Sequence, residues 1–298
     1  YKPESNFENL QTEICLKKTP VALKRIKEIS LKGFSPSSLE TYIKNPKEYY
    51  FQKLLNIKKE DVDESFASHK TIGLVFHETI ELLYKPFIGK YLEIKTLKDS
   101  LLKVDKVLKN TFVRNKESFD SGKNLIIFEV IKSALKTFIQ NELQDIKSGS
   151  VIKILALEHQ IKSTLKLNQE AGVLVTGIID RVDEKNGSVR IIDYKTGLVN
   201  SSNLTIKDMG LICKDPLRTK AMQLMCYAWM YYRGNNIKKI SAGIISFRNL
   251  SNGLMGLKIK DSKSDFIEGR SVDRFEEELK SLIKEIMDPK IDFIDSEI

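Results

Sequence analysis

Three cysteines in a chain of 298 residues leave little room for two kinds of scaffold. Cys15, Cys213 and Cys226 are far apart, are odd in number and form no C-x-x-C pair. A disulfide framework and a zinc knuckle both depend on paired cysteines. We therefore expect a protein of a reducing compartment, which points to the cytoplasm.

Long apolar runs are also missing. No stretch reaches the roughly 18 residues that a membrane-spanning helix needs. The polar N-terminal segment that begins at Tyr1 lacks the apolar run of a signal peptide. With 41% hydrophobic and 30% charged residues, the composition is typical of a globular protein rather than a disordered one, and we expect no membrane partner.

A nucleotide-binding glycine loop is the third absence. A Walker A loop requires G-x-x-x-x-G-K-[S/T], because its backbone amides cradle the phosphates of ATP. The Gly-Lys pairs at 89–90 and 122–123 lack both the upstream glycine and the following Ser or Thr. We predict no ATP site in this chain.

Positive charge, by contrast, is in excess. Lys and Arg number 49 against 40 Asp and Glu, which gives a net charge of +9. Such an excess favours polyanionic partners such as nucleic acid, although solvated surface lysines produce the same excess. The charge indicates a class of partner, and the motifs must locate the site.

The chain divides by pattern into a short extension and two larger parts. Residues 1–33 are predicted to be an N-terminal extension, 34–150 a helical part and 151–298 an α/β or α+β core. Residues 34–298 are expected to form one compact unit. The predicted helices of the first half begin at Ser35-Pro36 and at Pro46, and then cover about 71–84, 97–113 and 122–144.

After Gly149 the pattern becomes strand-like, with branched apolar residues bounded by turn residues. The predicted strands are Val151–Ile161, Gly172–Asp183, Ser188–Lys195, about 240–247 and about 254–259, and the predicted helices are about 217–233 and 269–287. A sheet core flanked by helices follows from this order.

Asn186-Gly187 between two apolar runs predicts a hairpin with a type I′ turn. In the register that this turn sets, Asp180 faces Asp193. Facing carboxylates repel each other, and a divalent cation between them would relieve the repulsion. A β-bulge would shift the register by one residue and separate the two aspartates.

Lys195 follows Asp193 by two residues and so lies on the same face of the strand. Oxygen ligands with one or two carboxylates suit Mg²⁺, and a lysine can orient water or stabilise negative charge on a phosphate in the transition state. On the opposite face, Asp183 and Arg190 are predicted to form a surface ion pair. Arg181 falls on that face too, and we assign it a structural role.

The segments GIIDRVD (177–183) and IIDYKTG (191–197) resemble the core of the PD-(D/E)XK nucleases, and most of all the RecB/AddB-type exonuclease domains of bacterial helicase–nucleases. The resemblance covers about residues 34–290, and Ile179 stands where the superfamily name has Pro. It implies a restriction-endonuclease-like mixed sheet and a Mg²⁺- or Mn²⁺-dependent DNA nuclease of repair or recombination, expected to be an exonuclease.

The resemblance also implies a histidine ligand on an upstream helix, in a G-x-x-x-H pattern that Gly73 and His77 match. Without that context His77 would be a buried core residue, as histidines on apolar helix faces commonly are. His69 and His159 match no such pattern and are predicted to be structural or exposed. The metal ligands implied are His77, Asp180, Asp193 and the Tyr194 backbone carbonyl.

Further residues are carried over on weaker patterns. Gln223 and Tyr227 match a Q-x-x-x-Y helix beside the active site, where Gln223 would contact substrate or water and Tyr227 DNA. Glu158, at the end of the first strand, resembles an acidic residue that some members use near the metal. DNA phosphates are expected to contact the basic residues before this helix: Lys214, Arg218 and Lys220.

One departure from the family concerns iron. Many AddB-type nucleases carry an iron–sulfur cluster whose first cysteine precedes a helix-starting proline, and here Asn45 precedes Pro46. The C-terminal cysteine triplet is missing from the sequence as well. We predict no cluster.

Three alternatives stay open beside a nuclease. A degenerate, catalytically silent nuclease could tether DNA in a repair complex, but the intact Asp, Asp and Lys argue against it. A phosphohydrolase of small phosphates or nucleotides is disfavoured by the basic charge, and a purely structural protein leaves the facing aspartates unexplained. The expected partners are DNA and a helicase domain or subunit, and we expect a monomer.

Overall fold

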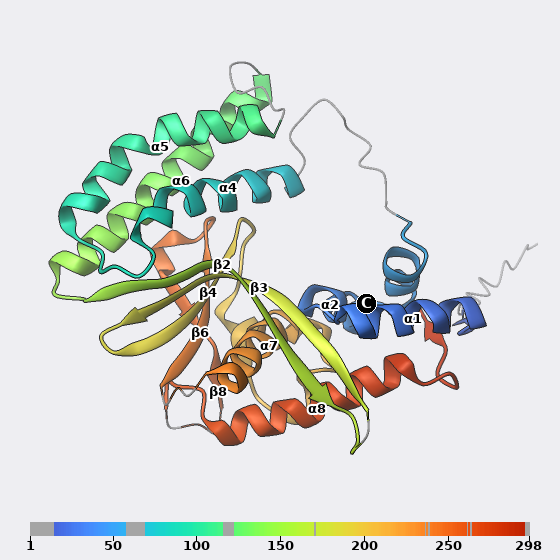
Figure 1. Ribbon diagram of the computed structural model, residues 1–298. Helices are drawn as coiled ribbons and strands as arrows, with labels where there is room; N and C mark the ends of the chain where they lie inside the picture. The colour runs from blue at the N-terminus through green and yellow to red at the C-terminus, as the bar shows by residue number, and fades with distance from the viewer. Residues whose placement is uncertain are drawn as a thin grey trace, which may run out of the picture.

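The computed structural model describes residues 15–57, 69–115, 122–169, 171–235, 237, 239–260, 262 and 264–295. Long helices lie over one face of a curved sheet and further helices run beneath it (Figure 1). The chain is therefore a layered α/β structure, with helices on both faces of a mixed sheet, as the order of the sequence patterns predicted. No helix in the described part is long and apolar enough to cross a membrane.

Five strands form the sheet in the order β2-β3-β4-β6-β7. Their bounds are Ile152–Lys166 (β2), Gly172–Lys185 (β3), Ser188–Lys195 (β4), Ile240–Ser246 (β6) and Leu254–Gly256 (β7). β4 and β6 are parallel, and all other neighbours are antiparallel. A parallel pair needs a crossover connection, and the helix α7 (Thr219–Gly234) lies within it.

The hairpin between β3 and β4 has the predicted turn and register. Asn186 and Gly187 have φ angles of 53° and 79°, the positive values that a type I′ turn requires. The strands pair from Lys185–Ser188 to Arg181–Ile192. The described ladder ends there, one step before Asp180 and Asp193, so the predicted facing pair lies at the point where the strands part.

The helical layer consists of α4 (His69–Tyr84), α5 (Ile94–Arg114) and α6 (Gly122–Lys147). Its apolar faces pack together and onto strand residues that include Ile192 and Tyr194. The tertiary packing of these amphipathic faces, rather than helix propensity alone, holds the three helices in place.

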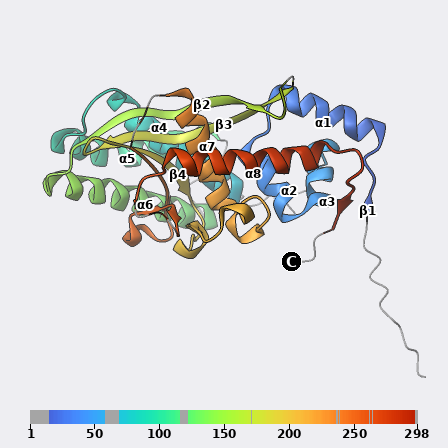
Figure 2. The same ribbon diagram turned by 90° about the horizontal axis from the view of Figure 1, so that it is seen from below.

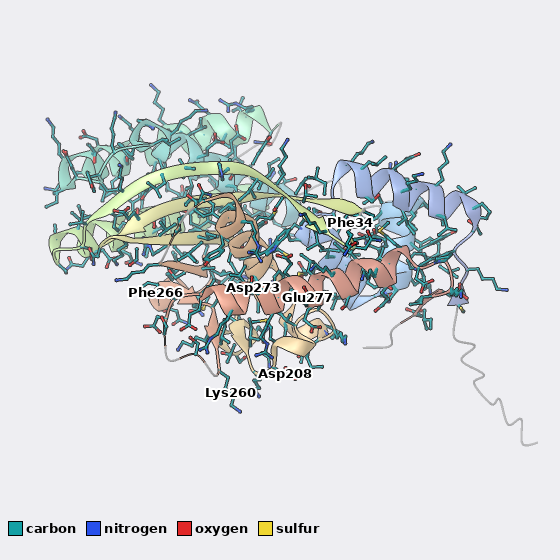
Figure 3. All side chains as sticks on the ribbon, turned by 60° about the horizontal axis from the view of Figure 1, so that its bottom comes forward. Phe34, Asp208, Lys260, Phe266, Asp273 and Glu277 are labelled. Atoms are coloured by element: carbon teal, nitrogen blue, oxygen red, sulfur yellow. The ribbon has the colours of Figure 1, made fainter. Side chains whose placement is uncertain are left out.

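The opposite face of the sheet is covered by α7 and α8 (Gly269–Met287), as the view from below shows (Figure 2). α7 is apolar almost all round, and Trp229 is only 1% exposed. α8 is amphipathic, with acidic residues such as Asp273 and Glu277 on its outer side (Figure 3). The fit of α7 between α8 and the sheet makes it the central helix of this layer.

The helices α1 (Pro20–Lys32), α2 (Pro36–Lys44) and α3 (Pro46–Tyr49) precede the helical layer, and a π-helical turn follows at Tyr50–Leu54. Both predicted proline starts are confirmed, with Ser35 capping α2 and Asn45 capping α3 through their side chains. Four further short strands form two pairs: β1 (Cys15–Leu16) with β9 (Phe293–Ile294), and β5 (Thr205–Ile206) with β8 (Lys258–Ile259).

Two details differ from the sequence patterns. The predicted strand 254–259 is split between β7, in the main sheet, and β8, which pairs with β5 instead. The described part of the predicted extension contributes α1, whose Ala22 and Ile26 are buried in the main core. Phe34 follows α1, is fully buried and bridges to Val175 of β3 (Figure 3). The division of the chain into domains stays a prediction.

A buried ion network joins β3 to the helical layer. Arg181 contacts Glu142 of α6 at 2.7 Å and Asp183 at 2.6 Å, and Arg190 contacts Asp183 at 2.7 Å. The prediction of a surface ion pair here was wrong, because α6 covers this face and leaves Arg181 and Asp183 0% exposed. Burial alone would raise the pKa of Asp183, but the two arginines outweigh it and hold that pKa below its usual value.

This network predicts a large stability cost for losing its cation. Arg181→Met would leave Glu142 and Asp183 as buried charges short of a partner, so we expect the free energy of unfolding to fall by about 3–5 kcal/mol. Arg25→Met is the control, because Arg25 pairs with Glu28 on the surface and such pairs contribute about 0–1 kcal/mol. Denaturant titration measures both, and equal losses would show that the network is not a strong constraint.

Candidate active site

Three side chains from three elements converge at the edge of the helical layer. His77 of α4, Glu158 of β2 and Asp180 of β3 each offer a ligand atom, and these atoms lie within 4.8 Å of one another. His77 Nδ1 is 3.5 Å from Asp180 Oδ1 and 3.9 Å from Glu158 Oε1. Around Mg²⁺, ligand atoms at about 2.1 Å are separated by about 3.0 to 4.2 Å. The two distances from His77 fall within this range, and the carboxylates of Glu158 and Asp180 are the oxygen donors that Mg²⁺ and Mn²⁺ prefer.

Glu158 belongs to the cluster for a reason that the sequence pattern missed. It was predicted to lie at the end of the first strand, but β2 continues to Lys166 and Glu158 lies within it. Its φ angle is 43°, a left-handed value that is uncommon outside glycine. Its neighbours Leu157 and His159 pair with Arg181 and Ile179, so Glu158 is opposite Asp180.

Asp180 is held where β3 and β4 separate. The backbone N–H of Tyr194 donates a hydrogen bond of 2.6 Å to Asp180 Oδ2, beyond the last described pair of the ladder. The Tyr194 side chain points away into the helical layer and is 2% exposed. Asp180 therefore keeps Oδ1 directed at His77 while Oδ2 is anchored to β4.

A second set of side chains surrounds Asp193. Its carboxylate is 2.8 Å from Lys195 Nζ, and Asp193 Oδ1 also accepts a hydrogen bond of 3.2 Å from Gln223 Nε2. Gln223 donates in addition to the Tyr227 hydroxyl at 3.1 Å. The structure thus brings Asp193, Lys195, Gln223 and Tyr227 together, one turn of α7 separating the last two.

Gly177, which opens the GIIDRVD segment, is required by the close approach of α7. A Cβ atom at this position would lie 2.8 Å from the Tyr227 ring and 3.2 Å from the end of Met230. Any larger residue would push α7 away from β3. The glycine therefore fixes how near Tyr227 and Gln223 come to the strand that carries Asp180.

His77 responds to the acidic groups that face it. Burial alone would lower its pKa, but the nearby carboxylates of Asp180 and Glu158 outweigh that effect and raise the pKa from 6.5 to about 10. The imidazole thus carries a proton at neutral pH, which balances part of the negative charge. A metal ion that binds His77 must displace this proton.

The pKa values of Asp193 and Lys195 are both raised, for different reasons. Burial and, to a lesser extent, the nearby Asp180 raise the pKa of Asp193 to about 6, although Lys195 opposes the rise. Burial would lower the pKa of Lys195, but Asp193 outweighs it and raises that pKa above 10.5. Lys195 therefore keeps its positive charge at neutral pH.

The three basic residues predicted to contact DNA occupy different places. Lys220 is half-buried, and its electrostatic partners include Glu40, Lys195 and Asp193, so it borders the site. Arg218 contacts the Ser202 carbonyl and Asp215 within its own loop. Lys214 is exposed. Of the other histidines, His159 is partly exposed on β2, while the side chain of His69 lies outside the described residues.

The comparison with known families agrees with this arrangement. The PD-(D/E)XK nuclease superfamily matches residues 33–297, nearly the whole chain. The chain belongs to the PD-(D/E)XK nuclease superfamily. Its five-stranded mixed sheet with flanking helices is consistent with the restriction-endonuclease-like fold of that superfamily.

Individual relatives are distant and much longer. The chain is 30% identical over 178 residues, 55% of its length, to an ATP-dependent helicase/deoxyribonuclease subunit of Clostridium acetobutylicum, and covers 15% of that protein. It is 27% identical over 179 residues, 59% of its length, to the like-named protein of Streptococcus agalactiae, again covering 15%. An uncharacterized protein of Rickettsia conorii is 25% identical over 207 residues, 65% of this chain and 23% of the relative. The chain thus spans less than a quarter of these relatives.

The buried charge of Asp193 predicts a stability cost in the metal-free protein. Because folding raises the pKa of Asp193 from 3.8 to about 6, the folded chain binds more protons than the unfolded chain between these values. The ionised carboxylate therefore destabilises the fold above about pH 6 and not below about pH 4. We expect Asp193→Asn to stabilise the protein at pH 7 in EDTA by on the order of 2 kcal/mol.

Thermal unfolding at pH 7 and pH 4 measures this effect. About 1 kcal/mol corresponds to roughly 2–4 °C in melting temperature for a chain of this size. The gain of the Asp193→Asn variant should vanish near pH 4, and Asp99→Asn, on the exposed side of α5, should change little at either pH. A destabilised Asp193→Asn protein at pH 7 would show that the pair with Lys195 outweighs the burial of the carboxylate.

Proposed function

We propose that the chain is a DNA nuclease domain that uses Mg²⁺ or Mn²⁺, and that it cuts DNA as an exonuclease in repair or recombination. The observation that carries this proposal is the position of the His77–Glu158–Asp180 cluster beside the Asp193–Lys195 pair, joined through adjacent strands. A hydrolytic phosphodiester site needs a cation site and a positive group near the reacting phosphate, and the cluster and the Lys195 ammonium would supply them.

The chain's own residues would divide the work. His77, Asp180 and Asp193 would hold the ion, with Glu158 and the Tyr194 backbone carbonyl as further oxygen donors to its coordination. The Lys195 ammonium would orient the attacking water or stabilise the added negative charge on the phosphate. Gln223 would hold the Asp193 carboxylate in place through its 3.2 Å hydrogen bond and contact water or substrate. A bound divalent ion would polarise the scissile phosphate and acidify water.

DNA as substrate and a helicase as partner are supported from outside the site. The relatives from Clostridium acetobutylicum and Streptococcus agalactiae are named as subunits of an ATP-dependent helicase/deoxyribonuclease. The net charge of +9 suits a polyanion. Lys220 borders the site and would contact a DNA phosphate, while Lys214 and Arg218 would do so from the preceding loop. The protein is expected to act as a monomeric nuclease unit in the cytoplasm.

A cleavage assay tests the proposal. End-labelled linear and circular DNA, single- and double-stranded, would be incubated with the protein in Mg²⁺, Mn²⁺ or EDTA. We expect cleavage that requires the metal, spares circles and falls by at least about 100-fold in Asp193→Asn and Lys195→Ala, the range seen for loss of one electrostatic catalytic group. Asp99→Asn and Lys103→Ala, which remove exposed charges on α5, are the matched controls.

Each other outcome has a distinct meaning. Cutting of circles would identify an endonuclease at the same site. Cleavage that survives both Asp193→Asn and Lys195→Ala would contradict the assignment of the site. An unmodified protein that binds DNA but does not cleave it in any metal would favour the silent tethering module instead.

A further inference from the structure

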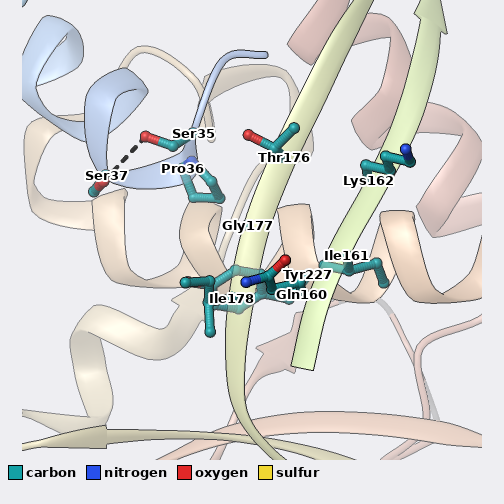
Figure 4. Close-up of a pocket in the computed structure, with 10 residues that line it drawn as sticks. All are labelled: Ser35, Pro36, Ser37, Gln160, Ile161, Lys162, Thr176, Gly177, Ile178 and Tyr227. Atoms are coloured by element: carbon teal, nitrogen blue, oxygen red, sulfur yellow. Dashed lines mark hydrogen bonds between the residues drawn. The ribbon is translucent and has the colours of Figure 1, made fainter. Parts of the chain in front are cut away.

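A pocket of about 580 Å³ lies between the start of α2, the β2–β3 hairpin and α7 (Figure 4). Ser35, Pro36 and Ser37 form its side on α2, and Tyr227 closes it from α7. The hairpin forms the rest with Gln160, Ile161, Lys162, Thr176, Gly177 and Ile178. Apart from Gly177 and Tyr227, the residues that line this pocket have no part in the candidate active site.

The pocket is continuous with the candidate metal cluster. Gln160 pairs with Ile178 on the neighbouring strand, and Lys162 pairs with Thr176. Glu158 and Asp180 are the residues two positions further along the same two strands, which corresponds to about 7 Å of strand. Tyr227 links the two regions from the other side, because its hydroxyl accepts the hydrogen bond from Gln223.

The polar groups that line the pocket include hydrogen-bond donors and the positively charged Lys162. Lys162 and Gln160 are exposed on the hairpin, and the Ser37 hydroxyl is exposed at the first turn of α2. Among the described residues that line the pocket, none is acidic. Phosphate oxygens accept hydrogen bonds from Lys, Ser and amide groups such as these, so the polar part of the pocket suits a phosphate backbone.

The apolar side chains of the pocket suit contact with the unpaired bases of a single strand. Ile178 is 47% exposed although it lies within β3, two residues before Asp180. The Tyr227 ring packs against Gly177 and forms the floor beside it. Bases of a single strand leave their faces free to pack on apolar and aromatic side chains, whereas a duplex keeps its bases stacked inside.

We propose that this pocket binds one strand of single-stranded DNA next to the phosphate that is cut, with Lys162 and Ser37 on the backbone and Ile178 against a base. The assignment rests on the proposed function, since it extends the substrate path from the same site. It also adds a substrate preference: the pocket beside the β2–β3 hairpin binds single-stranded DNA more tightly than a duplex.

Metal-free binding to a fluorescent twenty-residue oligothymidylate, measured by anisotropy in EDTA over a range of salt, tests the assignment. Lys162→Ala should lower the affinity about fivefold at 0.1 M salt and reduce the salt slope by about 0.7, the value for one phosphate contact on a single strand. Ile178→Ala removes three carbon atoms from a side chain that is 47% exposed in the free protein. It should lower the affinity about fourfold, the equivalent of about one fully buried methylene, and leave the salt slope unchanged. Neither variant should weaken binding to a blunt duplex.

Lys103→Ala is the matched control, because it removes an exposed lysine on the distant α5 and should leave single-strand affinity unchanged. Single-strand affinities of Lys162→Ala and Ile178→Ala equal to that of Lys103→Ala would overturn the assignment. Equal losses on single strand and duplex would overturn the single-strand specificity.

The assay also separates this assignment from the proposed function, because it needs no cleavage. Normal binding by both variants in a protein that cleaves DNA would reject the pocket alone. Weakened single-strand binding in a protein that cleaves nothing would support the pocket and reject the nuclease activity.

Discussion

The rest of the site depends on the crowding of negative charge where β3 and β4 separate. Asp180, Glu158 and Asp193 come from three neighbouring strands, and Asp193 is 2% exposed. Buried carboxylates are costly unless they are paired. His77, Lys195 and Gln223 each supply part of the compensation, through a charged imidazole, an ion pair and a hydrogen bond. A divalent cation bound by His77, Glu158 and Asp180 would compensate the remaining negative charge.

The two layers of helices hold the cluster from opposite sides. Asp180 contributes to the site, while the next residue, Arg181, ties the same strand to Glu142 of α6. α4, which carries His77, packs with α6 in that layer. From the other layer, Gly177 lets α7 approach closely enough for Gln223 to reach Asp193. The buried network on one side and the close helix contact on the other therefore fix the distances on which the candidate chemistry depends.

Local patterns were enough for much of this arrangement. The Asn186-Gly187 turn set the register of the hairpin, and the closing helix has the predicted bounds 269–287. Patterns within a strand could not reveal that α6 covers Arg181, because the covering residue Glu142 is 39 positions away in the sequence. The left-handed backbone at Glu158 was equally invisible, since no local pattern marks a non-glycine residue within a strand for a positive φ. The pocket at Lys162 arises only when α2 meets the hairpin.

Binding of a divalent cation at this cluster is the central claim, and calorimetric titration of Mn²⁺ into the protein at pH 8 tests it most directly. Repeating the titration in buffers of different ionisation enthalpy measures how many protons are released when the metal binds. The account predicts binding that is lost in Asp180→Asn, retained in Asp99→Asn and accompanied by release of about one proton, because the pKa of His77 is raised to about 10 in the metal-free site. Absence of binding, or equal affinity in Asp180→Asn and the unmodified protein, would contradict it.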